Sequence, residues 1–188
     1  PKSPADCFDM AFEAVRIALE HMIPVMFLSD GFIANGSEPW KFATTADLKD
    51  INVKFERPRL NGKSGEYLPY ARDERLVRKW AIPGTEGIEH RVGGLEKEDG
   101  TGNVSYDPEN HQKMTDIRRD KRDHVKFNIP DQEIDQGSEK GEVLILGWGG
   151  TYGSIRTVVH QLRKDGLDVS HAHLRYINPF PKNFEELL

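Results

Sequence analysis

The segment from residue 142 to residue 188 constrains the fold most, because its pattern is strand, glycine loop, helix, strand. An apolar run, EVLIL, passes into a loop with four glycines, and a second apolar run begins near Val169. Gly166 lies where a helix would end. One face of the predicted helix is apolar: Ile155, Val158, Val159 and Leu162. Such a unit has parallel strands and cannot bury both faces of its own sheet. It therefore predicts an α/β fold, and we expect this chain to be part of a longer one.

Residues 1–36 predict a second piece of α/β structure. Ser3 is a candidate N-cap for a helix that ends before Pro24. The apolar positions of this helix follow the spacing of one face: Phe8, Ala11, Phe12, Val15, Leu19 and Met22. The segment VMFLSDG then predicts a buried strand of a parallel sheet. Its last residues, Ser29, Asp30 and Gly31, stand at the carboxyl end of that strand, where α/β sheets bind ligands, and are candidate binding residues.

The middle of the chain, residues 37–141, is polar and rich in Gly, Pro and charge. Its clearest signal is a helix near residues 108–126, with Asp107 as N-cap and Pro108 in the first turn. An edge strand is expected from Lys54 to Arg59, and an exposed turn from Asn61 to Gly65. Aromatic side chains such as Tyr106 are expected to anchor this segment against its neighbours.

Composition excludes several classes of protein. The 188 residues carry 26 Lys and Arg against 31 Asp and Glu, a net charge of -5, which disfavours nucleic-acid binding. Apolar runs are far shorter than the roughly 20 residues that a membrane-spanning helix needs. The single cysteine, Cys7, cannot form an internal disulfide or hold an iron–sulfur cluster alone. The first residues, PKSPADC, contain no apolar segment of a signal peptide, so we expect a cytoplasmic protein.

The glycine loop has two interpretations. Its glycines, Gly147, Gly149, Gly150 and Gly153, follow a strand and precede a helix, which is the context of a phosphate-binding loop. The second strand, however, carries no acidic residue at its far end to bind the ribose of a dinucleotide. The sequence therefore favours a tight strand-to-helix turn over NAD binding.

Three further features have a functional and a structural interpretation. His171 and His173 share a strand face and could ligate a metal, but no third ligand is identifiable, so buried neutral histidines are favoured. Cys7 is near the start of a helix but beside apolar residues, which favours a buried core thiol. A basic cluster alternates with aspartates, which favours a solvated helix face over phosphate binding. Its cations are Arg118, Arg119, Lys121 and Arg122.

Several strings taken together resemble the alpha subunit of the 2-oxoacid:ferredoxin oxidoreductases, most closely the 2-oxoglutarate type. These strings include SPADCFDMAFEAVRIALEHMIPVMFLSDGF, PGTEGIEHRVGGLEKEDGTGNVSYDPENHQKM, LGWGGTYGSIRTVV and HAHLRYINPFP. The resemblance covers nearly the whole chain in the correct order. It departs at Lys97, where the family pattern leads us to expect histidine after GLE.

The resemblance implies a thiamine diphosphate enzyme that decarboxylates 2-oxoglutarate, passes electrons to ferredoxin through an iron–sulfur cluster and forms succinyl-coenzyme A. Residues 1–36 then resemble the end of a pyrimidine-binding domain, residues 37–141 a long connection, and residues 142–188 the start of a transketolase-C-terminal-like, Rossmann-type domain. The magnesium, diphosphate and cluster ligands are expected outside this chain, in part on a beta subunit. No catalytic residue is assigned to this chain.

Within the connection, His90, Glu96, Asp107 and His111 are expected to contact the beta subunit. An alternative function is that of a non-catalytic scaffold or assembly module, in which the connection wraps a partner subunit without taking part in the chemistry.

Overall fold

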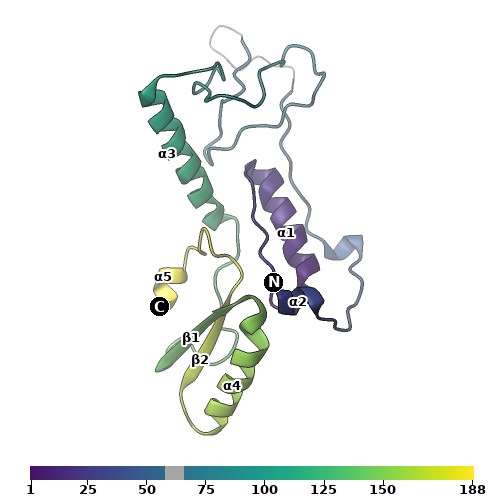
Figure 1. Ribbon diagram of the computed structural model, residues 1–188, viewed down its shortest axis with the longest axis vertical. Helices are drawn as coiled ribbons and strands as arrows, with labels where there is room; N and C mark the ends of the chain where they lie inside the picture. The colour runs from purple at the N-terminus through teal and green to yellow at the C-terminus, as the bar shows by residue number, and fades with distance from the viewer. Residues whose placement is uncertain (58–65) are drawn as a thin grey trace. The chain divides into compact units, whose positions relative to one another are not determined.

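A computed structural model of the protein describes residues 1–57 and 66–188 (Figure 1). Five helices and two strands are assigned in these residues, together with three short 3-10 turns. The helices are α1 (Asp6–His21), α2 (Gly31–Asn35), α3 (Pro108–His124), α4 (Tyr152–Lys164) and α5 (Phe184–Leu187). The strands are β1 (Val143–Trp148) and β2 (Val169–Leu174). The turns are Thr45–Asp47, Val125–Phe127 and Gly149–Thr151. None of these helices is long and apolar enough to cross a membrane.

The chain forms two compact units, which are described separately below. The first unit consists of Pro1–Val15, Val25–Lys49 and Lys126–Leu188. The second unit consists of Arg16–Pro24 and Asp50–Val125. The division at residues 36 and 141 that we expect from the family resemblance concerns domains of a longer protein and stays a prediction.

The strand–loop–helix–strand pattern of the first unit is confirmed. Strands β1 and β2 are parallel, with Val143 paired to Val169 at the start of the register, and α4 connects them (Figure 1). Helix α4 ends in a Schellman motif, because the Leu167 N–H donates to the Leu162 carbonyl at 3.0 Å. Gly166 has φ +90° at this point, a conformation that favours glycine. Val159 of α4 is fully buried, and β2 is buried from Val169 to His173.

Helix α1 begins at Asp6, later than a Ser3 N-cap predicts, and the face predicted to be buried is wrong. The Ser3 hydroxyl still accepts the Asp6 N–H at 3.3 Å, as a capping side chain does. Phe8 and Val15, from the predicted apolar face, are 39% and 50% exposed. The buried side chains of the helix instead follow another stripe, which is partly polar: Asp6, Met10, Glu13, Arg16, Ile17 and His21.

Long-range partners explain why a polar stripe is buried on α1. The Asp6 carboxylate accepts a hydrogen bond from Arg175, and the Glu13 carboxylate accepts one from the Tyr176 hydroxyl at 3.0 Å. Both partners come from the end of the first unit, more than 160 residues along the chain. Cys7, expected to be fully buried, is only half-buried.

The predicted strand after α1 is wrong. Residues 23–30 belong to no sheet in the part of the chain that the structure describes, and Met26 is 83% exposed. A strand requires a neighbour to receive its backbone hydrogen bonds. The sheet of the first unit contains only β1 and β2, so the apolar segment runs extended into Asp30, which caps α2.

The second unit is built around α3, which begins as predicted. The Asp107 carboxylate accepts hydrogen bonds from the N–H groups of Glu109 and Asn110, both at 3.2 Å, and Pro108 is the first helical residue. Tyr106 is 84% exposed, so the expectation that it anchors this segment is wrong within this chain. The preceding loop is instead held to α3 by polar contacts of Glu96, Lys97 and Asp99.

The expected edge strand in the second unit is reduced to an isolated bridge between Phe55 and Trp80. Trp80 also donates its indole N–H to the Leu19 carbonyl at 2.8 Å, so this bridge is fastened to the end of α1. Arg59, at the end of the expected strand, and the turn expected from Asn61 to Gly65 lie outside the described residues.

The N-cap of α3 gives a direct test of this local structure. Replacing Asp107 by Ala leaves two N–H groups without their acceptor, and we expect a loss of about 1 kcal/mol in the free energy of unfolding. Replacing Asp107 by Ser should retain most of that stability, because a hydroxyl also caps. Urea unfolding followed by circular dichroism measures both changes. Equal stability of the Ala variant and the unchanged protein would contradict the assignment.

Candidate functional site

The Asp30 carboxylate connects two loop segments of the first unit. Its Oδ1 accepts the Ile33 N–H at 2.9 Å, and its Oδ2 accepts the Gly150 N–H at 2.6 Å. These hydrogen bonds, from Ile33 and then from Gly150, hold the pKa of the Asp30 carboxyl below its ordinary value. A single side chain thus caps α2 and binds the glycine loop that precedes α4.

The glycine loop is shaped to receive this carboxylate. A Cβ atom on Gly150 would lie 2.7 Å from Asp30 Oδ2, and Gly149 has φ +61°. A Cβ atom on Gly147 would lie 2.5 Å from the Ile155 Cδ1 atom, so this glycine allows α4 to approach the sheet. The tight turn favoured by the sequence is therefore present. Its Gly150 amide binds an anion that belongs to the chain itself.

The two histidines of β2 lie together in the interior of the first unit. His171 is fully buried and His173 is 4% exposed, with their ring centroids 6.0 Å apart. The Tyr152 ring lies 5.5 Å from His171 and 5.0 Å from His173. Burial lowers the pKa of both imidazoles, that of His173 to about 4 in spite of the nearby Asp135 carboxylate. They are therefore neutral at pH 7, as the favoured interpretation requires.

The described residues contain no group of three or more His, Cys, Asp or Glu side chains that could hold a metal ion. The histidine pair thus lacks a third ligand of these types within that part of the chain.

Glu96 organises the surface of α3 in the second unit. Its Oε2 lies 2.7 Å from the His111 Nδ1, and its Oε1 lies 3.2 Å from an Arg118 nitrogen. These hydrogen bonds, chiefly from Arg118, hold the pKa of the Glu96 carboxyl below its ordinary value. The structure thus brings together Glu96 and His111, two of the four predicted partner-binding residues. Asp107 caps the same helix, whereas His90 contacts the Ile88 carbonyl elsewhere in the unit.

The loop that carries Glu96 is fastened by Lys97, where the sequence departs from the family pattern. Lys97 is buried, and its Nζ donates to the carbonyls of Gly93 and Leu95 at 2.6 and 2.5 Å. The Lys97 carbonyl in turn accepts the Asn110 side-chain amide of α3 at 2.9 Å. Lys97 therefore holds the turn at residues 93–95 closed and fixes it against α3.

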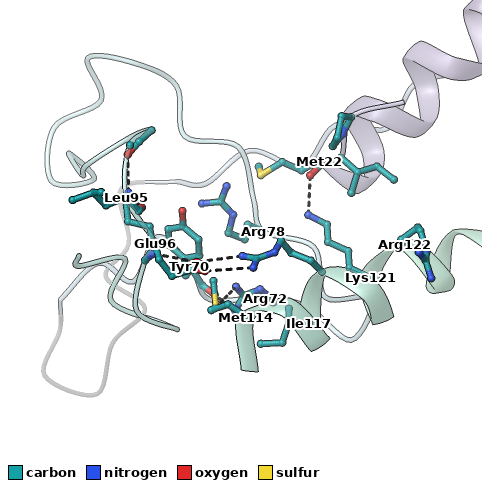
Figure 2. Close-up of a pocket in the computed structure, with 16 residues that line it drawn as sticks. Met22, Tyr70, Arg72, Arg78, Leu95, Glu96, Met114, Ile117, Lys121 and Arg122 are labelled. Atoms are coloured by element: carbon teal, nitrogen blue, oxygen red, sulfur yellow. Dashed lines mark hydrogen bonds and ion pairs between the residues drawn. The ribbon is translucent and has the colours of Figure 1, made fainter. Parts of the chain in front are cut away.

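A cavity of about 760 Å³ lies within the second unit (Figure 2). In Figure 2, Tyr70, Arg72 and Arg78 lie between α3 and the loop that carries Leu95 and Glu96. Among the described residues, the lining includes six cations and one carboxylate, Glu96. The cations are Arg72, Arg78, Lys97, Arg118, Lys121 and Arg122.

This cavity corrects one expectation and adds a feature that the sequence did not indicate. Lys121, expected on a solvated helix face, reaches back to donate to the Met22 carbonyl at 2.8 Å (Figure 2). Burial, with Arg78 and Arg72 nearby, lowers the pKa of Lys121 to about 8. Arg72 and Arg78 carry no sequence signal, because only the fold brings them to α3.

Comparison with known proteins places these sites in context. The model of the family "pyruvate flavodoxin/ferredoxin oxidoreductase, thiamine diphosphate-binding" matches residues 1–107. The 2-oxoglutarate oxidoreductase subunit KorA of Mycobacterium tuberculosis strain H37Rv is 50% identical over the whole chain. The alpha subunit of 2-oxoacid:ferredoxin oxidoreductase 1 from Aeropyrum pernix is 29% identical over 94% of the chain.

A solved structure has the same fold. It is a 2-oxoglutarate:ferredoxin oxidoreductase from Magnetococcus marinus, determined with 2-oxoglutarate, coenzyme A and succinyl-CoA bound. The TM-score is 0.80 and the sequence identity 28%, over 96% of this chain and 31% of that one. The chain likewise spans 28% and 27% of the lengths of the M. tuberculosis and A. pernix relatives.

The occupied glycine loop predicts that the protein does not bind NAD there. The Asp30 carboxylate takes the Gly150 amide and would repel a pyrophosphate at the same place. We expect isothermal titration calorimetry with NAD and NADH to show no micromolar binding that depends on Gly150. Micromolar binding that disappears in a Gly150→Ala variant would contradict this account of the loop.

Buried His173 predicts a dependence of stability on pH. Its pKa falls from 6.5 to about 4 on folding, so the unfolded chain takes up a proton at higher pH than the folded chain. Stability is therefore lost as the pH falls from about 6.5 towards 4, and this group has no effect above that window. Urea unfolding at pH 7 and pH 5 should show a smaller loss for His173→Asn than for the unchanged protein.

Replacing His160, which is exposed on α4, by Asn provides the control for this experiment. The His160→Asn variant should lose as much stability between the two pH values as the unchanged protein. An equal loss in the His173 variant would show that this histidine does not couple folding to protons.

Proposed function

The chain belongs to the pyruvate flavodoxin/ferredoxin oxidoreductase, thiamine diphosphate-binding family, and we propose that it forms part of the alpha subunit of a 2-oxoglutarate:ferredoxin oxidoreductase. The observation that carries this proposal is 50% identity over the full chain to a 2-oxoglutarate oxidoreductase subunit. The enzyme would decarboxylate 2-oxoglutarate, form succinyl-CoA and pass electrons to ferredoxin, as the sequence resemblance implies. Bound thiamine diphosphate would supply the carbanion for this chemistry.

The described residues do not fit the charged end of that cofactor. They contain no cluster of three metal-ligating side chains, and the glycine loop already binds the Asp30 carboxylate. We therefore propose that the magnesium and diphosphate ligands, and the iron–sulfur cluster, belong to other parts of the enzyme. Ser29 and Gly31 are exposed on either side of Asp30, and we propose that they border the uncharged part of the cofactor. Asp30 then acts as a positioning residue for this turn.

Exposed apolar residues support the view that a larger domain surrounds the first unit. Met26 is 83% exposed and Phe32 is 78% exposed, on either side of the Ser29–Gly31 turn. In a complete pyrimidine-binding domain, neighbouring elements would cover these side chains. This is consistent with our proposal that residues 1–36 end such a domain, that residues 37–141 connect, and that residues 142–188 begin a transketolase-C-terminal-like domain.

The α3 surface is the proposed contact with the beta subunit. Glu96, His111 and Arg118 form an exposed, ordered network near the N-terminus of a capped helix. Such a network fits a role in docking, which is also what the alternative function of a non-catalytic assembly module requires. His90 remains a proposed contact on the family resemblance alone. The location in the cytoplasm also stays a proposal.

An activity measurement tests the proposed function. The native enzyme that contains this chain should reduce a viologen dye only when 2-oxoglutarate, coenzyme A and thiamine diphosphate are all present. The 188-residue chain alone should be inactive, because no catalytic residue is assigned to it. Activity of the native enzyme with pyruvate but not with 2-oxoglutarate would overturn the substrate assignment. Complete inactivity with every 2-oxoacid would favour the assembly module.

The Glu96 network predicts a defect in assembly rather than in folding. Replacing Glu96 by Gln, or His111 by Ala, removes an exposed polar interaction that contributes about 0–1 kcal/mol to stability. We expect the dissociation constant of the subunit complex to rise by roughly tenfold, because charges at interfaces set partner choice. Analytical ultracentrifugation measures the association, and a melting curve measures stability.

The control for the assembly experiment is Glu86→Gln, an exposed glutamate of the same unit outside this network. It should change neither association nor melting temperature. A Glu96 variant that melts much earlier but assembles normally would show that the network serves folding alone.

A further inference from the structure

The cavity of the second unit contains more positive charge than its carboxylates neutralise. Three of its cations pair with carboxylates: Arg72 with Asp99, Arg118 with Glu96, and Arg122 with Asp123. The ion pairs among the described residues do not include Lys97, which instead binds two loop carbonyls. They do not include Arg78 or Lys121 either, and each of these donates to a single carbonyl. Arg78 and Lys121 are therefore the cavity cations with the fewest partners.

Arg78 and Lys121 are held by neutral groups. An Arg78 N–H donates to the Pro69 carbonyl at 3.3 Å, and its guanidinium lies 4.2 Å from the centroid of the Tyr70 ring. The Lys121 Nζ donates to the Met22 carbonyl at 2.8 Å. These contacts orient the two side chains but leave most of their N–H groups available, since guanidinium has five and ammonium three.

The electrostatics of the cavity favour an anion. Burial lowers the pKa of both Arg78 and Lys121, and Arg72 and Arg78 lower that of Lys121 further. Asp73 is the nearby carboxylate that acts in the opposite direction on Lys121. Positive charge is thus disfavoured by desolvation and by like charges, and a bound anion would relieve both effects.

The cavity also has apolar lining residues, which stand among the cations. They come from the end of α1 and from α3, and the ring of Tyr70 lies beside Arg78. The apolar residues are Met22, Ile23, Pro24, Met114 and Ile117. A volume of about 760 Å³ is in the range of small-molecule sites, which combine apolar lining with a few convergent polar groups. The ligand that matches this lining is a small anion with an apolar or aromatic body.

We propose that this cavity binds a small phosphate ester, with Arg78 and Lys121 on the phosphate oxygens and with Tyr70 and Met114 against the body of the ligand. Arginine matches phosphate geometry through paired N–H groups, and the Tyr70 ring already orients Arg78. An acidic peptide would match the charge but leave the apolar lining residues uncovered. The proposal rests on the cavity alone and holds whether or not the enzyme acts on 2-oxoglutarate.

Isothermal titration calorimetry of the native protein that contains this chain tests the site. The probes are pyrophosphate, ADP and hexaglutamate. Pyrophosphate and ADP should bind, ADP more tightly because its adenine can contact the apolar lining residues. In Arg78→Gln and in Lys121→Gln the affinity for both should fall by roughly tenfold, as expected for loss of a charged hydrogen bond. Arg119→Gln is the control, because Arg119 lies on α3 outside the cavity and pairs with Asp116 and Asp120.

Two outcomes of the titration would overturn the proposal. One is an affinity for pyrophosphate and ADP that is unchanged in both variants, which would place their binding elsewhere on the native protein. The other is tighter binding of hexaglutamate than of ADP, which would assign the cavity to an acidic protein segment.

A second measurement needs no variant and therefore does not depend on variant folding. Acetic anhydride should modify Lys121 and Lys113, both on α3, and mass spectrometry reports each site. Lys113 is exposed, pairs with Asp99 and lies outside the lining of the cavity. Saturating ADP should protect Lys121 and leave Lys113 unchanged. Equal modification of Lys121 with and without ADP would overturn the site.

Discussion

The hydrogen bonds of the Asp30 carboxylate join two parts of the first unit that are 120 residues apart in sequence. One oxygen caps α2 and the other binds the amide of Gly150 at the start of the α4 segment. Helix N-termini attract anions because their first N–H groups lack partners within the helix. In this protein the anion is a side chain, and the hydrogen bond that it accepts joins the start of α2 to the glycine loop before α4.

Close packing at this contact also explains why the loop contains glycines. Gly150 has no room for a side chain beside the carboxylate, and Gly147 has none beside Ile155. The same residues that suggest a dinucleotide site in the sequence therefore serve packing in the structure. The cationic cavity of the second unit differs, because there the described residues supply no carboxylate partner for Arg78 or Lys121.

The elements that the sequence predicted correctly are set by residues near one another in the chain. The cap at Asp107, the Schellman turn at Gly166 and the parallel pairing of β1 with β2 all follow from nearby residues. The strand at residues 25–30 and the buried face of α1 were wrong, because both depend on distant partners. A pattern of apolar spacing cannot reveal that Arg175 and Tyr176 would pair with Asp6 and Glu13.

The candidate sites follow the same rule. Glu96 and His111 stand in a string that is recognisable from the family, and the structure places them 2.7 Å apart. Arg78 and Lys121 are 43 positions apart in an unremarkable polar segment, and only the fold brings them to one cavity. Three observations support our proposal that the chain acts within a larger enzyme. They are its family membership, the exposed apolar residues around the Ser29–Gly31 turn, and the fact that it spans 28% of the length of the M. tuberculosis relative.

Amide hydrogen exchange in an Asp30→Ala variant tests the central claim, that one carboxylate holds both segments. A capping interaction of about 1 kcal/mol corresponds to roughly fivefold faster exchange when it is lost. We expect faster exchange at both Ile33 and Gly150, with exchange at Glu109 and Asn110 in the second unit unchanged. Faster exchange at Ile33 with no change at Gly150 would contradict this claim, because Asp30 would then be only a local helix cap.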